Sequence, residues 1–458
     1  MQEQPLTGSW LENDSSLAPP PFMVEGDIAI PIEARSLQLV FEINPSQQTA
    51  VGQARLGFTL PQSGRPLLDL VPRASRLSLD GQQINPERLK LVIPPDENTP
   101  LRMVDEQLAA GEHTLEISYP LRDATVQFVN GGARLGLFMT DLEQRGYLER
   151  HAPANLEFDQ LELSMEVHLA GTNDTHQIFS NGRISQPGNN AWQISFPDYF
   201  NCASCYLHLT NRAMHVREAS FAGLERDIRI TAYGEQLTGV QQALTNASIV
   251  MRELEQTYGP YTHESLLIYC TGEISGGMEY AGATMTGLSS LGHEITHSWF
   301  ARGVMPANGN AGWIDEAIAR WRDLGYPRAS GMPVRPPVNL AGFSPYRRHT
   351  PVESYALGSR LLSELDQLFS PGGLRPVLAQ LFRDKQRQLI STSFFQTFLE
   401  EATGTSLGPI FDRYVYGKSD GTEQPHEVEA AHTAVTTEAL SSPPPPRAFT
   451  TAELRTLL

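Results

Sequence analysis

The strongest chemical signal in the sequence is a pair of histidines four residues apart with a glutamate directly after the first, in His293-Glu-Ile-Thr-His297. Residues four apart share one face of a helix, so both imidazoles can reach one metal ion. Glu294 lies beside that face, where its carboxylate can hold a water next to the metal. A catalytic zinc site usually has three protein ligands and one open position, so a third ligand must come from elsewhere in the chain.

Glu316 is the candidate for the third ligand. It stands nineteen residues after His297, in Gly312-Trp-Ile-Asp-Glu316-Ala-Ile-Ala-Arg-Trp321, a segment that predicts a second helix able to pack against the first. The alternative is a solvated helix glutamate. We therefore expect one zinc ion per chain, held by His293, His297 and Glu316. Asp323 lies two helical turns further on, and a carboxylate placed there often orients a ligating histidine.

This motif resembles the zinc aminopeptidase family that includes aminopeptidase N and leukotriene hydrolase. Gly276-Gly-Met-Glu-Tyr280 similarly resembles the family's GxMEN motif. In that family the motif's glutamate binds the free α-amine of the substrate, and the glycine backbone aligns the peptide like an added strand. The resemblance thus implies substrate binding by Gly276, Gly277, Met278 and Glu279. An ammonium entering a partly dry pocket needs a carboxylate partner, although Glu279 could instead form a structural salt bridge.

The resemblance also implies two further roles. Tyr355, in a Tyr-x-x-Gly context that opens a predicted helix, matches the family tyrosine that donates a hydrogen bond to the oxyanion. A core tyrosine is the alternative, and Tyr346 is the fallback candidate. The segment around Glu149 resembles the one that supplies a further amine-binding residue, and Glu149 is our choice for it. His151 and Glu157 are expected to be structural.

Together these residues imply a zinc-dependent aminopeptidase that hydrolyses the first bond of a peptide or small amide with a free N-terminus. Glu294 would act as general base and Tyr355 would polarise the carbonyl. Two alternatives stay open: a non-aminopeptidase zinc hydrolase, acting on a specialised amide or ester or as an endopeptidase, and an inactive scaffold. The intact HEITH motif argues against the scaffold, which has no need of a general base.

The surrounding pattern predicts a multidomain α+β protein. Residues 1–25 are polar and Pro-rich and are expected to form a flexible tail. Residues 26–215 carry short alternating runs and turn signals, as expected of an N-terminal β-sandwich-like domain. Residues 216–418 change to helical spacing, with predicted helices at 236–258, 288–302, 311–325, 354–370, 374–387, 391–403 and 407–417. The resemblance makes this a thermolysin-like, mainly helical catalytic domain.

Residues 419–458 are expected to be a Pro-rich linker followed by a short helix that Thr450 and Glu453 cap. The family's large C-terminal helical domain has no counterpart in the sequence, so we expect a more open site or a partner subunit over the cleft. Tyr280 also departs from the family, which usually has Asn there.

Composition limits the remaining possibilities. The chain has 458 residues and a net charge of −18, which argues against sequence-independent binding of nucleic acid. No apolar run approaches the length of a transmembrane helix, and the N-terminal residues do not look like a secretory signal, so a cytoplasmic location is expected. Cys202, Cys205 and Cys270 are too few for a disulfide framework and are expected to be reduced structural thiols.

Overall fold

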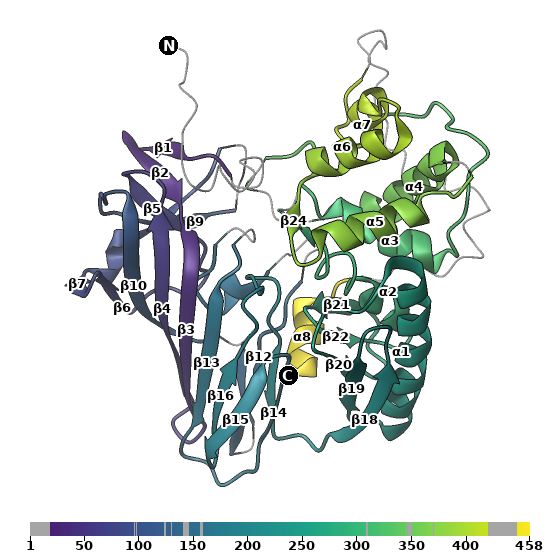
Figure 1. Cartoon of the computed structure of the whole chain (residues 1–458). Coiled ribbons are helices and arrows are strands. Elements are labelled where there is room, and N and C mark those ends of the chain that lie inside the picture. Colours follow the sequence, from purple (N-terminus) through teal and green to yellow (C-terminus); the bar gives the residue numbers. More distant parts are fainter. Residues whose placement is uncertain are drawn as a thin grey trace.

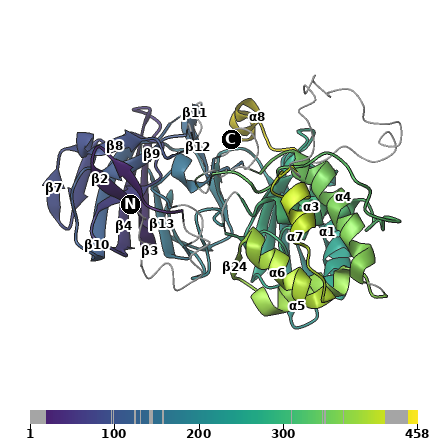
Figure 2. The same ribbon diagram turned by 90° about the horizontal axis from the view of Figure 1, so that it is seen from above.

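The computed structural model describes residues 19–419 and 447–458, except 96, 98, 123, 124, 130, 141–145, 156–158, 308, 309, 345, 347–349 and 370. Most of the expected N-terminal tail, the Pro-rich linker and Glu157 therefore lie outside the described residues. A β-rich half and a half that contains most of the helices lie side by side (Figures 1 and 2). This arrangement confirms the predicted fold class.

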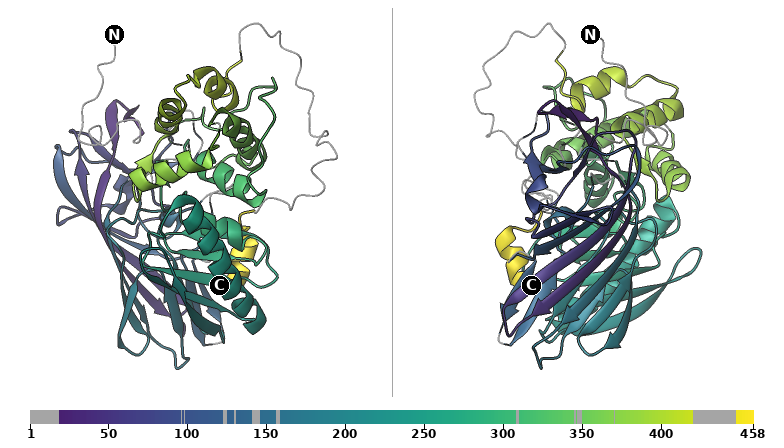
Figure 3. Two further views of the ribbon diagram at one scale, coloured as in Figure 1. Left: turned by 45° about the vertical axis from the view of Figure 1, so that its right-hand side comes forward. Right: turned by 90° about the vertical axis from the view of Figure 1, so that its left-hand side faces the viewer.

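The largest sheet has eight strands, and long curved strands form its centre (Figure 3). Leu37, Leu39, Phe41 and Ile43 are buried at alternate positions of β3, the period expected when one face of a strand packs on a core. The strand order is β15 (Arg183–Gly188), β16 (Ala191–Ser195), β13 (Glu162–Leu169), β3 (Glu33–Asn44), β4 (Thr49–Leu60), β10 (Gly111–Pro120), β6 (Arg76–Leu79) and β7 (Gln82–Ile84).

Two smaller sheets complete the β-rich half. The five-stranded sheet has the order β1 (Phe22–Val24), β2 (Asp27–Pro31), β5 (Arg65–Leu68), β9 (Leu101–Val104) and β8 (Leu89–Val92). The four-stranded sheet has the order β11 (Val126–Val129), β12 (Gly132–Gly136), β17 (Leu207–Thr210) and β14 (Gln177–Ser180). Because β1 begins at Phe22, regular structure begins inside the segment expected to be a tail.

The second half is built on a five-stranded sheet and a group of helices. The sheet order is β18 (His215–Ala222), β19 (Asp227–Gly234), β20 (Ser265–Cys270), β22 (Ala283–Thr286) and β21 (Gly277–Tyr280). The helices are α1 (Leu237–Tyr258), α2 (Leu291–Thr296), α3 (Trp313–Asp323), α4 (Ser359–Asp366), α5 (Arg375–Lys385), α6 (Thr392–Thr403) and α7 (Gly408–Tyr414). The short strands β23 (Met305–Pro306) and β24 (Leu389–Ile390) pair with each other.

Both faces of this sheet are buried at β20, β22 and β21, which explains the continuous apolar run in β20. Leu266 and Ile268 belong to the core beneath the helices, whereas Leu267 and Tyr269 belong to the core shared with the β-rich half. Successive side chains of a strand point to opposite faces, so each face receives every second residue. The helices therefore cover one face and the N-terminal domain covers the other.

Most of the predicted helices are present, but α2 is much shorter than the range 288–302. The regular helix ends at Thr296, and the backbone then turns through Ala301, whose φ is 131°. Arg302 N–H donates to the His297 carbonyl at 2.9 Å, which holds this turn. The predicted helix over 354–370 likewise begins with a π-helical turn at Ser354–Gly358.

The predicted cap of the last helix is confirmed. Helix α8 (Thr451–Leu457) begins with a capping box in which the Glu453 N–H donates to Thr450 and the Thr450 N–H donates to Glu453. The three cysteines are buried and are thiols rather than members of a disulfide, as expected of structural thiols. Burial raises the pKa of Cys205 to about 12, so this thiol is unreactive at neutral pH. No helix in the described part of the chain is long and apolar enough to cross a membrane.

Candidate metal centre

Helix α2 and the residue after it bring the two histidines onto one face. Their rings lie 4.8 Å apart between centroids, and both Nε2 atoms approach the same carboxylate oxygen, Oε2 of Glu316. That oxygen is 3.0 Å from Nε2 of His293 and 3.5 Å from Nε2 of His297. Glu316 extends from the first turn of α3, which packs against α2. The three predicted ligands therefore converge, and all of them are buried.

The other nitrogen of each histidine is held in place. Nδ1 of His293 is 2.7 Å from Oδ2 of Asp323, and Nδ1 of His297 is 3.1 Å from the Phe300 carbonyl. A partner on Nδ1 fixes the ring and leaves Nε2 available to a metal. Asp323 thus lies where an orienting carboxylate was expected.

The electrostatics of the cluster favour a bound cation. Burial alone would lower the pKa of His297, but the carboxylates of Glu279 and Glu316 outweigh burial and raise that pKa well above its usual value. Burial also opposes protonation of His293, yet hydrogen bonds with Asp323 and Glu316 raise its pKa to about 10. A cluster that holds protons this tightly has an excess of negative charge. Two imidazole nitrogens and one carboxylate are also the donor types that zinc prefers, so the triad is consistent with a single zinc site.

Glu294 lies against the edge strand of the sheet, at the side of the triad. A β-carbon on Gly277 would lie only 1.9 Å from Oε1 of Glu294, so this approach of β21 to α2 requires glycine. Burial raises the pKa of Glu294 to about 8, against the opposing charges of the histidines. Glu279, Glu294 and His297 also form a second buried group of potential ligand atoms.

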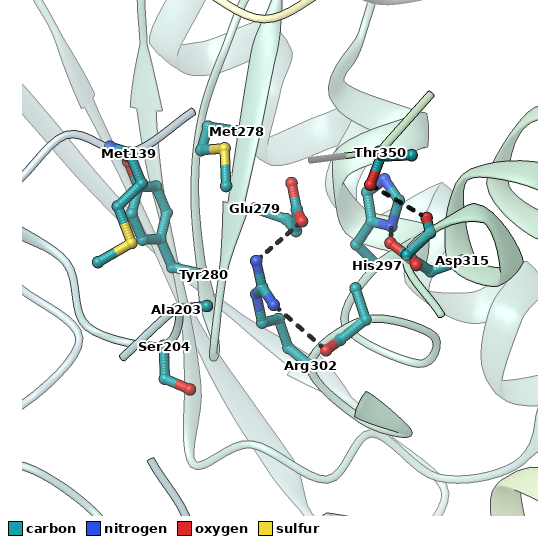
Figure 4. A network of polar contacts seen from close by, with 12 residues as sticks. Met139, Ala203, Ser204, Met278, Glu279, Tyr280, His297, Arg302, Asp315 and Thr350 are labelled. Carbon is teal, nitrogen blue, oxygen red and sulfur yellow. Dashed lines mark hydrogen bonds and ion pairs between the residues drawn. The ribbon is translucent and has the colours of Figure 1, made fainter. Parts of the chain in front are cut away.

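Glu279 is paired with a basic side chain inside the protein. Arg302 Nη2 donates to Oε1 of Glu279 at 2.9 Å, and both side chains are almost fully buried (Figure 4). The structural salt bridge, which was the alternative reading of Glu279, is therefore present. The carboxylate nevertheless belongs to the cluster of the metal centre, because it contributes to the raised pKa of His297.

The structure explains the unusual Tyr280. Met278 and Tyr280 point into the core shared with the N-terminal domain, whereas Gly277 and Glu279 face the metal centre. The hydroxyl of Tyr280 accepts the Met139 N–H at 3.0 Å, and its ring packs edge-on against Tyr206. Of the motif residues expected to bind substrate, Met278 therefore lies on the opposite face of the strand, and Tyr280 serves the domain interface.

Two tyrosines were considered for the oxyanion, and they lie in different places. The Tyr355 hydroxyl donates to Oε1 of Glu316 at 2.8 Å, and its ring stacks near His293. Tyr346 instead packs edge-on against Phe22 in a small core of the N-terminal domain. Tyr355 is thus part of the cluster, and the fallback candidate is not.

The Glu149 side chain forms hydrogen bonds to the backbone of its own turn. Its carboxylate accepts the Tyr147 N–H at 3.0 and 3.1 Å, and it belongs to neither of the two buried ligand groups found among the described residues. The sequence analysis also missed Asp315, a buried carboxylate whose Oδ2 is 3.5 Å from Nδ1 of His297. The feature of the sequence that could have identified Asp315 is its position directly before Glu316. Figure 4 shows Asp315, Arg302 and Glu279, with Met139, Ala203 and Ser204 of the N-terminal domain to one side.

The four residues at the centre of the site are buried. The side chains of His293, Glu294, His297 and Glu316 are each less than 5% exposed. The described residues alone therefore bury these side chains, and the more open cleft expected without a C-terminal helical domain stays a prediction. A partner subunit over the cleft stays a prediction.

The fold is similar to that of several solved structures. An M1 zinc metallopeptidase mutant from Deinococcus radiodurans, solved with a Tyr-Ser-Ala substrate, has a TM-score of 0.61 and 16% identity, with 85% of this chain and 95% of that chain covered. Legionella pneumophila aminopeptidase A in complex with aspartic acid has a TM-score of 0.65 and 12% identity, with 85% and 50% covered. Yeast LTA4 hydrolase in complex with bestatin has a TM-score of 0.61 and 13% identity, with 86% and 69% covered.

No protein-family model and no curated protein matches the chain. The solved structures therefore define the fold, which is that of the two-domain M1 zinc metallopeptidases. Within this fold, the chain carries a buried His–His–Glu triad.

Proposed function

We propose that this chain is an M1-type zinc aminopeptidase that releases the first residue of short peptides or aminoacyl amides. The observation that carries the proposal is the convergence of both Nε2 atoms on Glu316, with the carboxylates of Glu294 and Glu279 beside them. Zinc bound by the triad would supply Lewis acidity and make water a better nucleophile at neutral pH.

The surrounding residues can perform the remaining steps. Glu294 takes the proton of the attacking water and then transfers it to the leaving amine, a role suited to a carboxyl whose pKa burial raises. Tyr355 is close enough to the triad for its phenol to donate to the developing oxyanion. Glu279 faces the same cluster and offers a negative charge to the substrate's ammonium.

The test is hydrolysis of a panel of aminoacyl-amidocoumarins by zinc-loaded protein, with an N-acetylated copy of each substrate as the matched control. We expect release of the fluorophore from the free-amine substrates alone. Hydrolysis of both sets at equal rates, or of the acetylated set alone, would rule out an aminopeptidase. No hydrolysis of either set with zinc bound would also contradict the proposal.

A second candidate function is supported by the Arg302–Glu279 pair. A guanidinium 2.9 Å from the proposed amine anchor already neutralises its charge and repels a second cation. A hydrolase that acts on N-blocked amides or esters would tolerate this arrangement. The acetylated substrates therefore decide between the two functions.

A further inference from the structure

β21, the strand that carries Glu279, lies at the edge of its sheet and has one free edge of its own. Among the strands that the structure describes, β21 pairs with β22 alone, and the Gly287 N–H donates to the Gly276 carbonyl at 3.0 Å. In an antiparallel pair, successive residues alternate between bonding to the partner strand and pointing away from it. The main chains of Gly277, Glu279 and Ala281 therefore point to the free edge of β21.

The chain itself occupies both ends of this free edge. The Ala281 N–H donates to the Ser204 carbonyl at 3.1 Å, and the Gly277 N–H donates to the Arg447 carbonyl at 3.3 Å. Arg447 belongs to residues 447–458, which we call the strap and which include α8. The segment is about 170 residues away in sequence, yet it bonds to the strand in the way an added peptide strand would.

The strap also lies directly on the glycines. Gly276 has a φ of +124°, and a β-carbon there would lie 2.5 Å from the Arg447 carbonyl and 3.4 Å from the Phe449 ring. Arg447 lines a cavity of about 620 Å³ together with His293 and Asp323. The strap therefore borders Gly276 and the start of α2, on the side of His293 that faces Asp323.

Several contacts fix the strap to both halves of the molecule. Helix α8 lies at their junction (Figures 1 and 2), where Tyr269 Oη donates to the Leu457 carbonyl at 3.0 Å and Arg212 Nη2 donates to the Thr456 carbonyl at 2.7 Å. Phe449, Leu454, Leu457 and Leu458 are buried in the shared core. Burial removes these large apolar side chains from water, so the strap is a stable part of the fold.

The position of the strap limits the distance along β21 between Glu279 and Arg447. In the proposed function, Glu279 binds the substrate's amine, and Glu294, which lies over Gly277, acts at the scissile bond. The leaving group then extends past Gly277 towards Gly276 and Arg447. Two residues of strand span about 7 Å, the length of about two residues of extended substrate.

We propose that the strap closes the leaving-group side of the cleft and restricts the enzyme to dipeptides and aminoacyl amides. This inference rests on the proposed function. A substrate with one residue beyond the scissile bond fits between Glu279 and Arg447, whereas a third residue meets the strap carbonyl that already bonds to Gly277.

The experiment compares kcat/KM of the zinc-loaded full chain for di-, tri- and pentaalanine. We expect a fall of about tenfold or more from dialanine to pentaalanine, because the longer peptide must displace a bonded segment. Phe449→Ala removes the ring over Gly276 and should reduce this ratio severalfold, while the exposed control Arg455→Ala should leave it unchanged. Arg447→Ala, which removes the exposed ion pair with Glu453, is the second variant in case Phe449→Ala does not fold.

Equal kcat/KM values for dialanine and pentaalanine would overturn the proposal. Binding of the same peptides to the zinc-loaded Glu294→Gln variant, measured by calorimetry, separates this proposal from the proposed function. If the wild type hydrolyses no peptide but dialanine binds more tightly than pentaalanine, the function fails and the restriction on length stands. Equal dissociation constants would reject the length restriction whether or not the wild type is active.

Discussion

At the scale of single residues, a substitution at Glu294 can change the charge of the side chain without changing its shape. Glu294→Gln keeps the shape of the side chain but removes its ability to accept a proton, so we expect turnover to fall by about 10²–10⁴-fold. Zinc content should stay at one ion per chain, because Glu294 is not in the His–His–Glu triad. Steady-state kinetics and metal analysis check both expectations.

The control for this change is Glu273→Gln, at an exposed position shortly before the Gly276–Tyr280 motif. It should leave turnover within a factor of about two, as surface substitutions usually do. Substantial activity in Glu294→Gln would remove Glu294 from the role of general base.

A substitution of Asp323 tests whether this carboxylate positions the metal ligand His293. Asp323→Asn keeps the size of the side chain but weakens the 2.7 Å contact that orients His293, so zinc affinity should fall about 10–100-fold. Competition with a chromophoric chelator measures this affinity without relying on activity. Asp198→Asn, at an exposed site, is the matched control, and an unchanged zinc affinity in Asp323→Asn would contradict the orienting role.

At the scale of elements, the contact between β21 and α2 determines where the general base lies. Gly277→Ala would place a methyl group 1.9 Å from the present position of Oε1 of Glu294, so the carboxylate must move. A displacement of about 1 Å at a reacting group can cost about 10²-fold in rate, and we expect a loss of that size in kcat with zinc retained.

Gly239→Ala provides the control for this substitution. Gly239 lies inside α1, and the nearest atom to a new β-carbon there would be 4.0 Å away. Alanine is the better helix former, so this variant should be more stable by about 0.5–1 kcal/mol with kcat unchanged. Thermal denaturation and kinetics of the two variants would show the contrast, and wild-type kcat in Gly277→Ala would disprove the role of this contact.

At the scale of the whole molecule, one core joins the two halves. It contains strands of the N-terminal domain, one face of the catalytic sheet and the strap. Leu454→Ala should therefore lower the stability of the protein as a unit, by about 2–5 kcal/mol, with a single transition in calorimetry. Leu224→Ala, at a side chain that is 63% exposed, should cost less than about 0.5 kcal/mol. Two separate transitions in the wild type would show that the halves unfold independently.

The sequence was sufficient for features that depend on local spacing. The interval of four residues places His293 and His297 on one helical face whatever surrounds them, and the pattern of HEITH followed by Glu316 names all three members of the triad. The alternating burial in β3 and the capping box at Thr450 could be predicted for the same reason. Each arises from the geometry of a few consecutive residues. Helix α2 was predicted too long because its end depends on the turn that places Arg302 beside Glu279.

The remaining features come from contacts between residues that are far apart in the chain, and only the tertiary structure decided them. The pairing of Glu279 with Arg302, the packing of Tyr280 against Tyr206 and the strap on Gly277 depend on how separate elements meet. The hydrophobic periodicity of the sequence does not predict such contacts. It indicates which face of a strand is buried but not which element packs against that face. The sequence therefore determined which groups could bind zinc, and the fold decided what encloses them.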